Sequence, residues 1–387
     1  MISIKTYNKI SPVGLQVFDP QQYEISDQAA NPVGAIVRSA SLHDEVFPDS
    51  LLAIARAGAG TNNIPIERCS DKGILVFNTP GANANAVKEL VIAGLLLSSR
   101  RILPAIEWAK TLKGNGDQVG KMVEKGKGAF AGPEIRGKKI GVIGLGAIGV
   151  LVANAASQLG MTVYGYDPYL SLQSAWNLSH RIKRAASLNE IYENCDYITL
   201  HIPLTKDTKD TINAAALASM KDGVRILNFA RDGLVNSADM IMALEQGKVA
   251  SYVVDFPTDE MIGVNGVICI PHLGASTPES EDNCAEMAAK ELIDYIENGN
   301  ISNSVNLPNI SMPRSGERRI CVIHKNIPNM LTSITTAVAK ENLNIENLLN
   351  KSRGEIAYTM IDVNETQLDE VDRDIAAIEG VIRIRII

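Results

Sequence analysis

The sequence lacks the marks of a secreted, zinc-binding or membrane-spanning protein. Its five cysteines are scattered and include no CxxC pair, which argues against a disulfide framework and against a zinc site, so no metal is expected. Residues 1–7 lack a charged segment followed by an apolar core and do not read as a signal peptide. The longest apolar run, residues 90–97, is far shorter than a membrane span. We therefore expect a cytoplasmic protein with no membrane partner.

The chain also lacks an excess of positive charge. It has 37 Lys and Arg against 44 Asp and Glu, and its formal net charge is −7. Because a polyanion such as DNA needs a clustered positive surface, no nucleic-acid partner is expected. A small anionic substrate is compatible with this balance, since a few local arginines suffice to bind it.

What the chain does have is the size and composition of a soluble protein with two or three domains. It has 387 residues, of which 45% are hydrophobic and 21% charged. In the first ninety residues, apolar strands at 34–39, 51–57 and 73–78 are separated by helix-length segments, which indicates a parallel sheet covered on both faces. A helix beginning near Asn85 is apolar almost all round and is expected in a core or a subunit interface.

Two further series of elements follow. The first is a second α/β unit, with strands predicted at residues 139–143, 162–166, 197–202, 224–230, 250–256 and 267–270. A stretch rich in Pro, Ser and Asn, residues 303–316, then marks a boundary. After it the pattern is βαββαβ, a ferredoxin-like order, with elements predicted at 319–324, 330–341, 345–349, 357–363, 365–378 and 382–386. The predicted fold class is thus α/β, with two doubly wound Rossmann- or flavodoxin-like lobes and a C-terminal ferredoxin-like domain.

A dinucleotide site is predicted at the start of the second unit. Gly144, Gly146 and Gly149 form GxGxxG directly after an apolar strand, and the helix opens at Ala147 and Ile148. Glycines allow a tight turn and let backbone N–H groups approach a pyrophosphate at the helix N-terminus. Alone the pattern could be a plain glycine turn. The next strand, however, ends in Asp167, 18 residues after Gly149, where a carboxylate accepts hydrogen bonds from ribose hydroxyls and repels a 2′-phosphate. The combination predicts NAD as the cofactor.

Three polar residues of the second unit are candidates for catalysis. Arg231, Glu260 and His272 each follow a predicted strand, at the sheet edge where α/β proteins bind ligands. Oxidation of a secondary alcohol needs a base for the hydroxyl proton, and His has a suitable pKa. A neighbouring carboxylate would hold the imidazole tautomer, and an Arg would bind a substrate carboxylate with two hydrogen bonds. Each residue alone could be an ordinary surface residue; together they favour a dehydrogenase.

At this point the sequence resembles the D-2-hydroxyacid dehydrogenase family over residues 33–305. The matching stretches include residues 73–90, 137–149, 226–235 and 269–277. The resemblance implies that Arg231, Glu260 and His272 carry catalysis and that Asp255 contacts the nicotinamide amide. It also implies further cofactor contacts, at Ile202, Ala230, Arg231, His272 and Gly274. Ile202 departs from the Thr of many relatives, and the loop from Glu260 to His272 is shorter than in several of them.

The family fold implies a discontinuous first lobe, with the ligand cleft between the two lobes. We expect residues 1–90 and 283–304 to form the substrate-binding lobe and residues 91–282 the NAD-binding domain. Residues 305–316 are expected to be a linker and residues 317–387 a regulatory domain that resembles an ACT domain.

The resemblance also bears on the substrate. Arg38 and Arg56 fall where members that oxidise 3-phospho-D-glycerate, in the first step of L-serine synthesis, place cations for the distal phosphate; Asn83 matches a substrate contact. We therefore expect a phosphorylated hydroxy acid as the substrate. The alternatives are a dehydrogenase for glyoxylate, hydroxypyruvate or another unphosphorylated acid, and a non-catalytic NAD- or amino-acid-sensing protein on the same fold.

In the ACT-like domain, the resemblance implies that His324, Asn326 and Asn344 bind L-serine at a domain interface and so inhibit the enzyme. Asn329 stands where ACT loops usually carry Gly, and we expect the turn to survive because Asn tolerates positive φ next best. A homodimer or homotetramer is expected.

Overall fold

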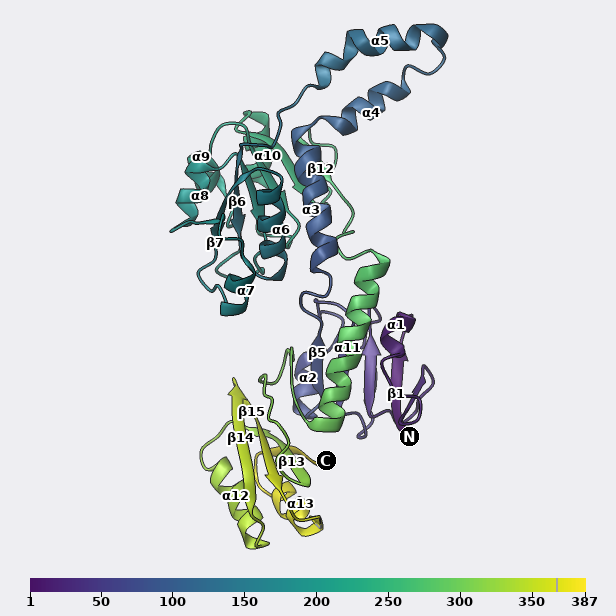
Figure 1. Cartoon of the computed structure of the whole chain (residues 1–387), viewed down its shortest axis with the longest axis vertical. Coiled ribbons are helices and arrows are strands. Elements are labelled where there is room, and N and C mark those ends of the chain that lie inside the picture. Colours follow the sequence, from purple (N-terminus) through teal and green to yellow (C-terminus); the bar gives the residue numbers. More distant parts are fainter. Residues whose placement is uncertain (367) are drawn as a thin grey trace. The chain divides into compact units, whose positions relative to one another are not determined.

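The computed structural model describes residues 1–366 and 368–387 and divides into two compact units. One consists of Met1–Asn83 and Pro278–Ile387, and the other of Ala84–Thr277 (Figure 1). Each unit is described by itself below. In the part of the chain that the structure describes, no helix is both long and apolar enough to cross a membrane.

The unit Ala84–Thr277 is built on a seven-stranded parallel sheet of order β12-β11-β10-β9-β6-β7-β8. Its strands are β6 (Lys139–Ile143), β7 (Thr162–Tyr166), β8 (Lys183–Arg184), β9 (Tyr197–Leu200), β10 (Val224–Asn228), β11 (Val249–Val254) and β12 (Val267–Cys269). The helices that accompany this sheet are α3 (Ala84–Ser99), α6 (Ala147–Gln158), α7 (Leu172–Asn177), α8 (Leu188–Asn194), α9 (Ala214–Ser219) and α10 (Ser237–Glu245). Separate apolar clusters fill the two faces of the sheet, as expected for a doubly wound fold. The six predicted strands are confirmed.

Local sequence signals start several of these helices. Ser171, Ser187, Asn213 and Asn236 are the N-caps of α7, α8, α9 and α10, and each side chain accepts a hydrogen bond from a backbone N–H of the first turn. Such caps satisfy donors that have no partner inside the helix. They place each helix start after a strand end, which fixes the loops at the ligand-binding edge of the sheet.

A helical arm projects from this unit. It contains α4 (Ile102–Lys110), η1 (Gly116–Gln118), α5 (Val119–Gly126) and η2 (Lys127–Phe130), and α4 and α5 extend together away from the sheet (Figure 1). The Trp108 and Phe130 rings pack with their centroids 5.2 Å apart. Ile102, Leu103 and Ile106 of α4 are nevertheless 41–47% exposed.

The first lobe of the other unit holds a five-stranded parallel sheet of order β2-β1-β3-β4-β5. Its elements are β1 (Ile2–Tyr7), α1 (Pro12–Leu15), β2 (Tyr23–Ser26), β3 (Gly34–Val37), β4 (Ala53–Arg56), α2 (Ile66–Asp71), β5 (Leu75–Asn78) and α11 (Pro278–Asn298). The parallel sheet was predicted from β3, β4 and β5. The central strand β1 and its neighbour β2 were not predicted. Only Ile4 of β1 is fully buried, and the sequence of this strand contains no continuous apolar run.

The C-terminal part is a four-stranded antiparallel sheet of order β14-β15-β13-β16. It contains β13 (Arg318–Lys325), α12 (Met330–Lys340), β14 (Ile345–Arg353), β15 (Ile356–Val363), α13 (Asp369–Ala376) and β16 (Val381–Ile386). This is the predicted βαββαβ order, so the α/β fold class is confirmed. The prediction for Asn329 is also confirmed, since it has φ 67° in the turn that starts α12.

Side chains of the antiparallel sheet cap the C-terminal end of α11. Arg385 donates to the carbonyls of Tyr295 and Ile296, at 2.6 and 3.2 Å. Arg319 and Tyr358 reach the carbonyls at residues 298 and 299, at 2.8 and 2.9 Å. The last carbonyls of a helix lack intrahelical partners and carry partial negative charge, so guanidinium donors suit them. The apolar face of this sheet shares one core with the parallel sheet of its unit.

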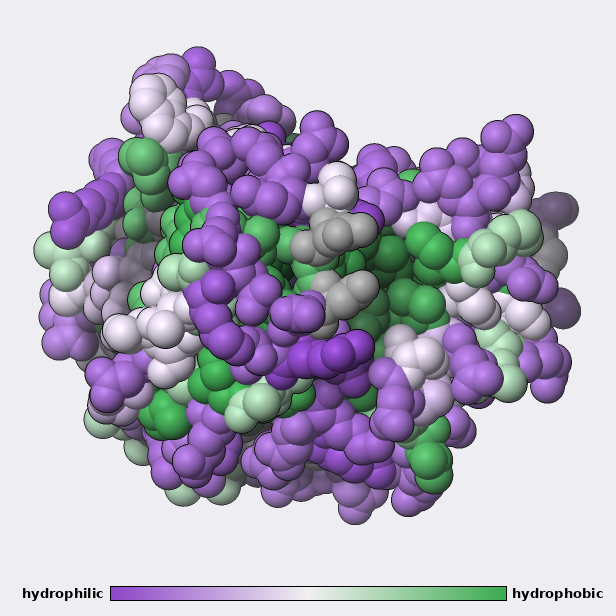
Figure 2. Space-filling view, turned by 90° about the horizontal axis from the view of Figure 1, so that it is seen from below, coloured by the Kyte–Doolittle hydropathy of each residue, from purple (hydrophilic) through white to green (hydrophobic). Residues whose placement is uncertain are grey.

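On the face drawn in Figure 2, hydrophilic residues surround areas of apolar residues.

Candidate active site

The glycine turn after β6 has the geometry of a dinucleotide-binding loop. Gly144 has φ +90°, and a Cβ there would lie 2.5 Å from the carbonyl oxygen of His201. A Cβ on Gly149 would lie 1.9 Å from the Gly144 oxygen, so both positions require glycine. At Gly146 a Cβ would meet nothing within 4 Å, which leaves open space at the start of α6. Ala147 and Ile148 form the first turn of that helix, where N–H groups are free for an anion.

Asp167 supports this turn from the end of β7. Its Oδ2 accepts a hydrogen bond from Leu145 N and its Oδ1 one from Tyr169 N, both at 2.8 Å. A pocket of about 520 Å³ lies beside it, walled by apolar residues and by Lys183 and Arg184 of β8. Each carboxylate oxygen has a second lone pair and remains able to accept a ribose hydroxyl. The carboxylate thus supports the turn structurally, and its contact with the ribose stays a prediction.

Two buried side chains of this unit, Asp255 and His201, each have one polar atom without a hydrogen-bond partner among the described residues. Asp255 is 1% exposed, and among the described residues its Oδ1 has no hydrogen-bond partner. Burial raises the pKa of this carboxyl to about 6, although its own backbone N–H and the charge of Arg231 act in the opposite direction. His201 lies under the turn, and burial lowers its pKa to about 3, so the ring is neutral. Its Nε2 is 2.9 Å from Thr199 Oγ1.

These observations fit NAD. The open space at Gly146 and the free N–H groups at the start of α6 suit a pyrophosphate, and the carboxylate at Asp167 suits an adenosine ribose. A carboxamide carries the N–H donors that the unpartnered Oδ1 of Asp255 lacks. Gly274 lies beside Asp255, since a Cβ there would be 3.6 Å from Oδ2. Ile202 borders the turn, with its Cγ2 2.8 Å from an ideal Cβ at Gly144.

The segment after β10 is shaped by Asn228, which was not predicted from the sequence as a site residue. This buried side chain accepts from Ala230 N at 3.2 Å and donates to the carbonyl of Arg231 at 3.0 Å. These two bonds fix the backbone of Ala230 and Arg231, from which the predicted substrate-binding side chain extends. Arg231 itself is exposed, and its Nη1 donates to Ala230 O at 2.7 Å. The detectable signal was an amide residue at the end of a strand, directly after the apolar pair Ile226 and Leu227.

His272 lies within the electrostatic influence of Arg231. Partial burial and the positive charge of Arg231 lower the pKa of the imidazole, which favours the neutral form that a general base needs. The ring packs on Phe256, with centroids 4.6 Å apart. Glu260 is exposed, and no hydrogen bond or ion pair found among residues 1–366 and 368–387 joins it to His272. The pairing of these two residues stays a prediction.

The predicted phosphate-binding arginines lie together in the other unit. Arg56 ends β4 and Arg38 follows β3; the strands pair in register, and Arg56 Nε donates to Arg38 O at 3.1 Å. The Arg56 guanidinium lies against Gly58, whose Cβ would be 1.7 Å from Nη1, and the φ of +145° at this position favours glycine. Burial lowers the pKa of Arg56 and the charge of Arg38 lowers it further, although Cys284 opposes this. Asn83, at the end of this segment of the unit, is half-buried.

In the antiparallel sheet the predicted serine ligands differ in accessibility. His324 is 2% exposed; its Nδ1 is 2.8 Å from Lys325 O and its Nε2 is 2.9 Å from Thr359 Oγ1. Asn326 and Asn344 are exposed, and their amides donate to Gly354 O and to the Glu346 carboxylate. Two of the three residues thus present polar groups to solvent, while the imidazole is already hydrogen-bonded at both nitrogens.

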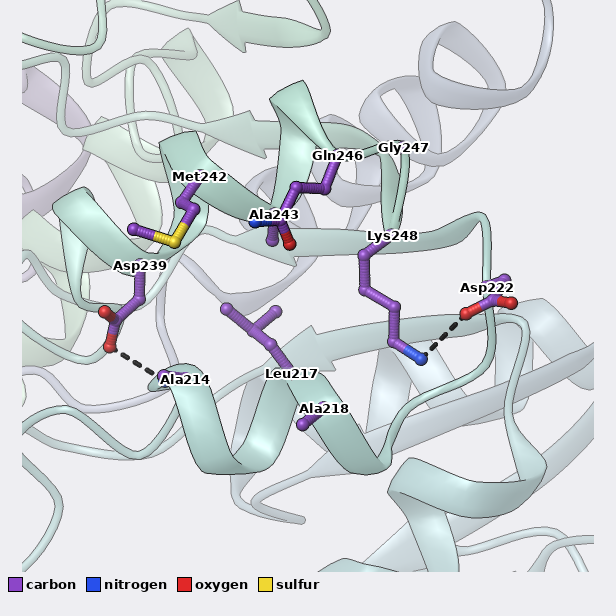
Figure 3. Close-up of a pocket in the computed structure, with 10 residues that line it drawn as sticks. All are labelled: Ala214, Leu217, Ala218, Asp222, Asp239, Met242, Ala243, Gln246, Gly247 and Lys248. Atoms are coloured by element: carbon purple, nitrogen blue, oxygen red, sulfur yellow. Dashed lines mark hydrogen bonds and ion pairs between the residues drawn. The ribbon is translucent and has the colours of Figure 1, made fainter.

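A surface pocket of about 480 Å³ lies elsewhere on the nucleotide-binding unit, between α9 and α10 (Figure 3). Leu217 and Met242 contribute apolar surface, and the Lys248–Asp222 ion pair, at 2.8 Å, crosses one end. None of the predicted site residues lines this pocket, so it is separate from the glycine turn and His272.

Comparison with known proteins agrees with this reading of the chain. Residues 93–274 match the family model of the D-isomer specific 2-hydroxyacid dehydrogenase NAD binding domain, and residues 320–383 match that of the AHAS small subunit-like ACT domain. The D-3-phosphoglycerate dehydrogenase of Haemophilus influenzae is 31% identical, over 87% of this chain and 81% of its own length. That of Escherichia coli is 32% identical, over 95% and 90%.

The chain belongs to the D-2-hydroxyacid dehydrogenase family. It carries the family's NAD-binding domain followed by an ACT-type domain. Among solved structures, the cofactor (NAD+)-bound 3-phosphoglycerate dehydrogenase of Entamoeba histolytica has a TM-score of 0.60 at 24% identity, and the match covers 79% of this chain and 98% of that one. At this identity the match supports the fold alone.

Proposed function

We propose that this member of the D-2-hydroxyacid dehydrogenase family catalyses the NAD-dependent oxidation of 3-phospho-D-glycerate to 3-phosphohydroxypyruvate, the first step of L-serine biosynthesis. The observation that carries the proposal is the 31–32% identity to D-3-phosphoglycerate dehydrogenases over 87–95% of the chain. The Escherichia coli match covers 95% of the chain and so includes both the NAD-binding and the ACT-type domains, which is more than a shared cofactor-binding fold.

The glycine turn, Asp167 and Asp255 would hold NAD, which would supply the hydride acceptor for oxidation of the alcohol carbon. Neutral His272 takes the hydroxyl proton, because its pKa is held below the ordinary value and its ring is free to accept at neutral pH. Arg231 binds the substrate carboxylate, and Glu260 accepts the second N–H of the imidazolium. The buried carboxylate of Asp255 would hold the carboxamide of NAD through its unpartnered oxygen.

Arg38 and Arg56 bind the distal phosphate, and Asn83 supplies a further polar contact to the substrate. Two guanidinium groups at neighbouring strand ends, one of them mostly withdrawn from water, match the charge and oxygen geometry of a phosphate.

A substrate panel with NAD tests the function. We expect turnover of 3-phospho-D-glycerate, and we expect Arg56→Ala to raise its KM at least tenfold while D-glycerate is little affected. A preference for glyoxylate, hydroxypyruvate or another unphosphorylated acid would mean that the chain is a dehydrogenase for that acid and not for 3-phospho-D-glycerate. NAD binding without turnover of any 2-hydroxy acid would favour a sensing protein.

We propose that the ACT-type domain binds L-serine through His324, Asn326 and Asn344 and that serine inhibits the enzyme. The exposed amides of Asn326 and Asn344 can bind the charged groups of an amino acid. For His324 to take part, its imidazole must break its hydrogen bond with Lys325 O or with Thr359 Oγ1 and form one with serine instead. The test is to measure the initial rate of the wild type and of Asn344→Ala at increasing serine concentrations. A wild-type rate that does not change with serine would contradict serine inhibition.

We also propose a homodimer or homotetramer in the cytoplasm. The exposed apolar side chains Ile102, Leu103 and Ile106 form a patch on the arm, and such patches mark contact surfaces. Light scattering of Ile106→Glu should show a smaller species than the wild type, and cell fractionation tests the location.

A further inference from the structure

The two candidate phosphate-binding arginines have unequal electrostatic surroundings. Arg38 Nη2 is 2.7 Å from Glu281 Oε1, and both side chains are half-exposed. Arg56 has no carboxylate partner among the ion pairs of the described part of the chain, and its Nε donates to a backbone carbonyl instead. One cation is therefore already neutralised by an acidic side chain, and the other is not.

Glu281 is held near Arg38 by the way α11 begins. It lies in the first turn of that helix, and its neighbour Asp282 accepts a hydrogen bond from the hydroxyl of Ser11. Asn283 donates to the carbonyl of Ala82 at 3.5 Å. Because both contacts tie the first turn of α11 to the lobe that carries the arginine, the carboxylate stays within reach of it.

We propose that Glu281 is a specificity-determining residue, which competes with the substrate phosphate for Arg38 and so sets how strongly a phosphorylated acid is preferred. This inference rests on the proposed function, because it assigns Arg38 to the phosphate. Glu281 acts only through the guanidinium of Arg38 and takes no part in proton or hydride transfer.

The direction of the effect follows from the charges. A half-exposed ion pair is a weak interaction, so the phosphate displaces Glu281 with little loss. The displaced carboxylate then stays close to a phosphate dianion, and like charges at short range repel. Removing the negative charge of Glu281 should therefore strengthen phosphate binding more than the loss of orientation of Arg38 weakens it.

The test is the kinetics of Glu281→Gln, which keeps the shape and removes the charge. We expect the KM for 3-phospho-D-glycerate to fall roughly three- to tenfold, with kcat, the KM for NAD and the KM for D-glycerate unchanged. Glu279→Gln is the matched control, since this exposed acid lies in the same helical turn. It should leave all four constants unchanged.

Each other outcome contradicts the inference. A raised KM would mean that Glu281 orients Arg38 and does not compete for it, and an unchanged KM would mean that the ion pair has no influence. An equal change in Glu279→Gln would indicate a general charge effect of the helix. Wild-type protein without activity on 3-phospho-D-glycerate would refute the proposed function, whereas an active wild type with an unaltered Glu281→Gln refutes only this inference.

Discussion

The guanidinium of Arg385 donates a 2.6 Å hydrogen bond to the carbonyl of Tyr295 and lies 4.2 Å from the centroid of that residue's ring. Arg385 belongs to β16 of the antiparallel sheet, and Tyr295 to the last turns of α11. The C-terminal end of the longest helix of the lobe is thus completed by a side chain 90 residues later in the chain.

We predict that Arg385→Met destabilises this unit by roughly 2–3 kcal/mol, because carbonyls of a buried helix end lose their donors. Urea unfolding would measure the loss, and hydrogen exchange should show faster exchange at the end of α11. Arg318→Met, at an exposed position on β13, is the control and should unfold like the wild type. Equal stability of the two variants would mean that the cap contributes nothing.

His272→Ala should lower kcat by several orders of magnitude and leave NAD affinity largely intact. The acidic limb of kcat/KM in the wild type should lie below the ordinary histidine pKa, because burial and Arg231 both favour the neutral ring. Rate measurements across pH, together with NAD titration of the variant, check both points. Substantial turnover by His272→Ala would remove this residue as the base.

Asp167→Ala should raise the KM for NAD roughly tenfold to a hundredfold, since hydrogen bonds to a charged group contribute about 1.5–3 kcal/mol. The ratio of NADP to NAD activity should rise at the same time, because a negative charge beside the 2′ position is lost. Steady-state kinetics with both cofactors measure this, and exposed Asp207→Ala serves as the control. Equal use of NADP and NAD by the wild type would contradict the assigned selectivity.

Glu291 should make stability depend on pH. Burial raises the pKa of this carboxyl to about 8, although Asn303 donates a 2.7 Å hydrogen bond to it, and its second oxygen has no partner among the described residues. Between the ordinary carboxyl pKa and about 8, the unfolded chain loses a proton that the folded chain retains. The free energy of unfolding therefore falls as the pH rises through this window, by at most about 1.4 kcal/mol per pH unit.

Glu291→Gln should remove this contribution, so that the variant gains stability over the wild type as the pH rises towards 9. Denaturant unfolding at pH 6, 7.5 and 9 measures the difference, with Glu279→Gln as an exposed control. A constant difference between variant and wild type at all three values would show that Glu291 does not titrate in this range.

Much of the site could be predicted because it depends on short-range patterns. The glycines at 144, 146 and 149 and the acid at Asp167 are recognisable where strand, turn and helix follow one another, and the structure places all of them at one loop. Contacts between distant positions gave no such signal. Neither the Glu281 carboxylate beside Arg38 nor the ring of Phe256 against His272 could be read from spacing.

The sequence by itself determined the strands of the nucleotide-binding unit, the βαββαβ order of the C-terminal domain, the fold class, the dinucleotide motif and the family, because hydrophobic periodicity and glycine positions act over a few residues. Only the tertiary structure decided that β1 lies between β2 and β3, that His324 is hydrogen-bonded inside its sheet, and that Arg385 caps α11. Those arrangements depend on which surfaces exclude water together and on which buried polar groups find partners, and both conditions involve residues far apart in the chain.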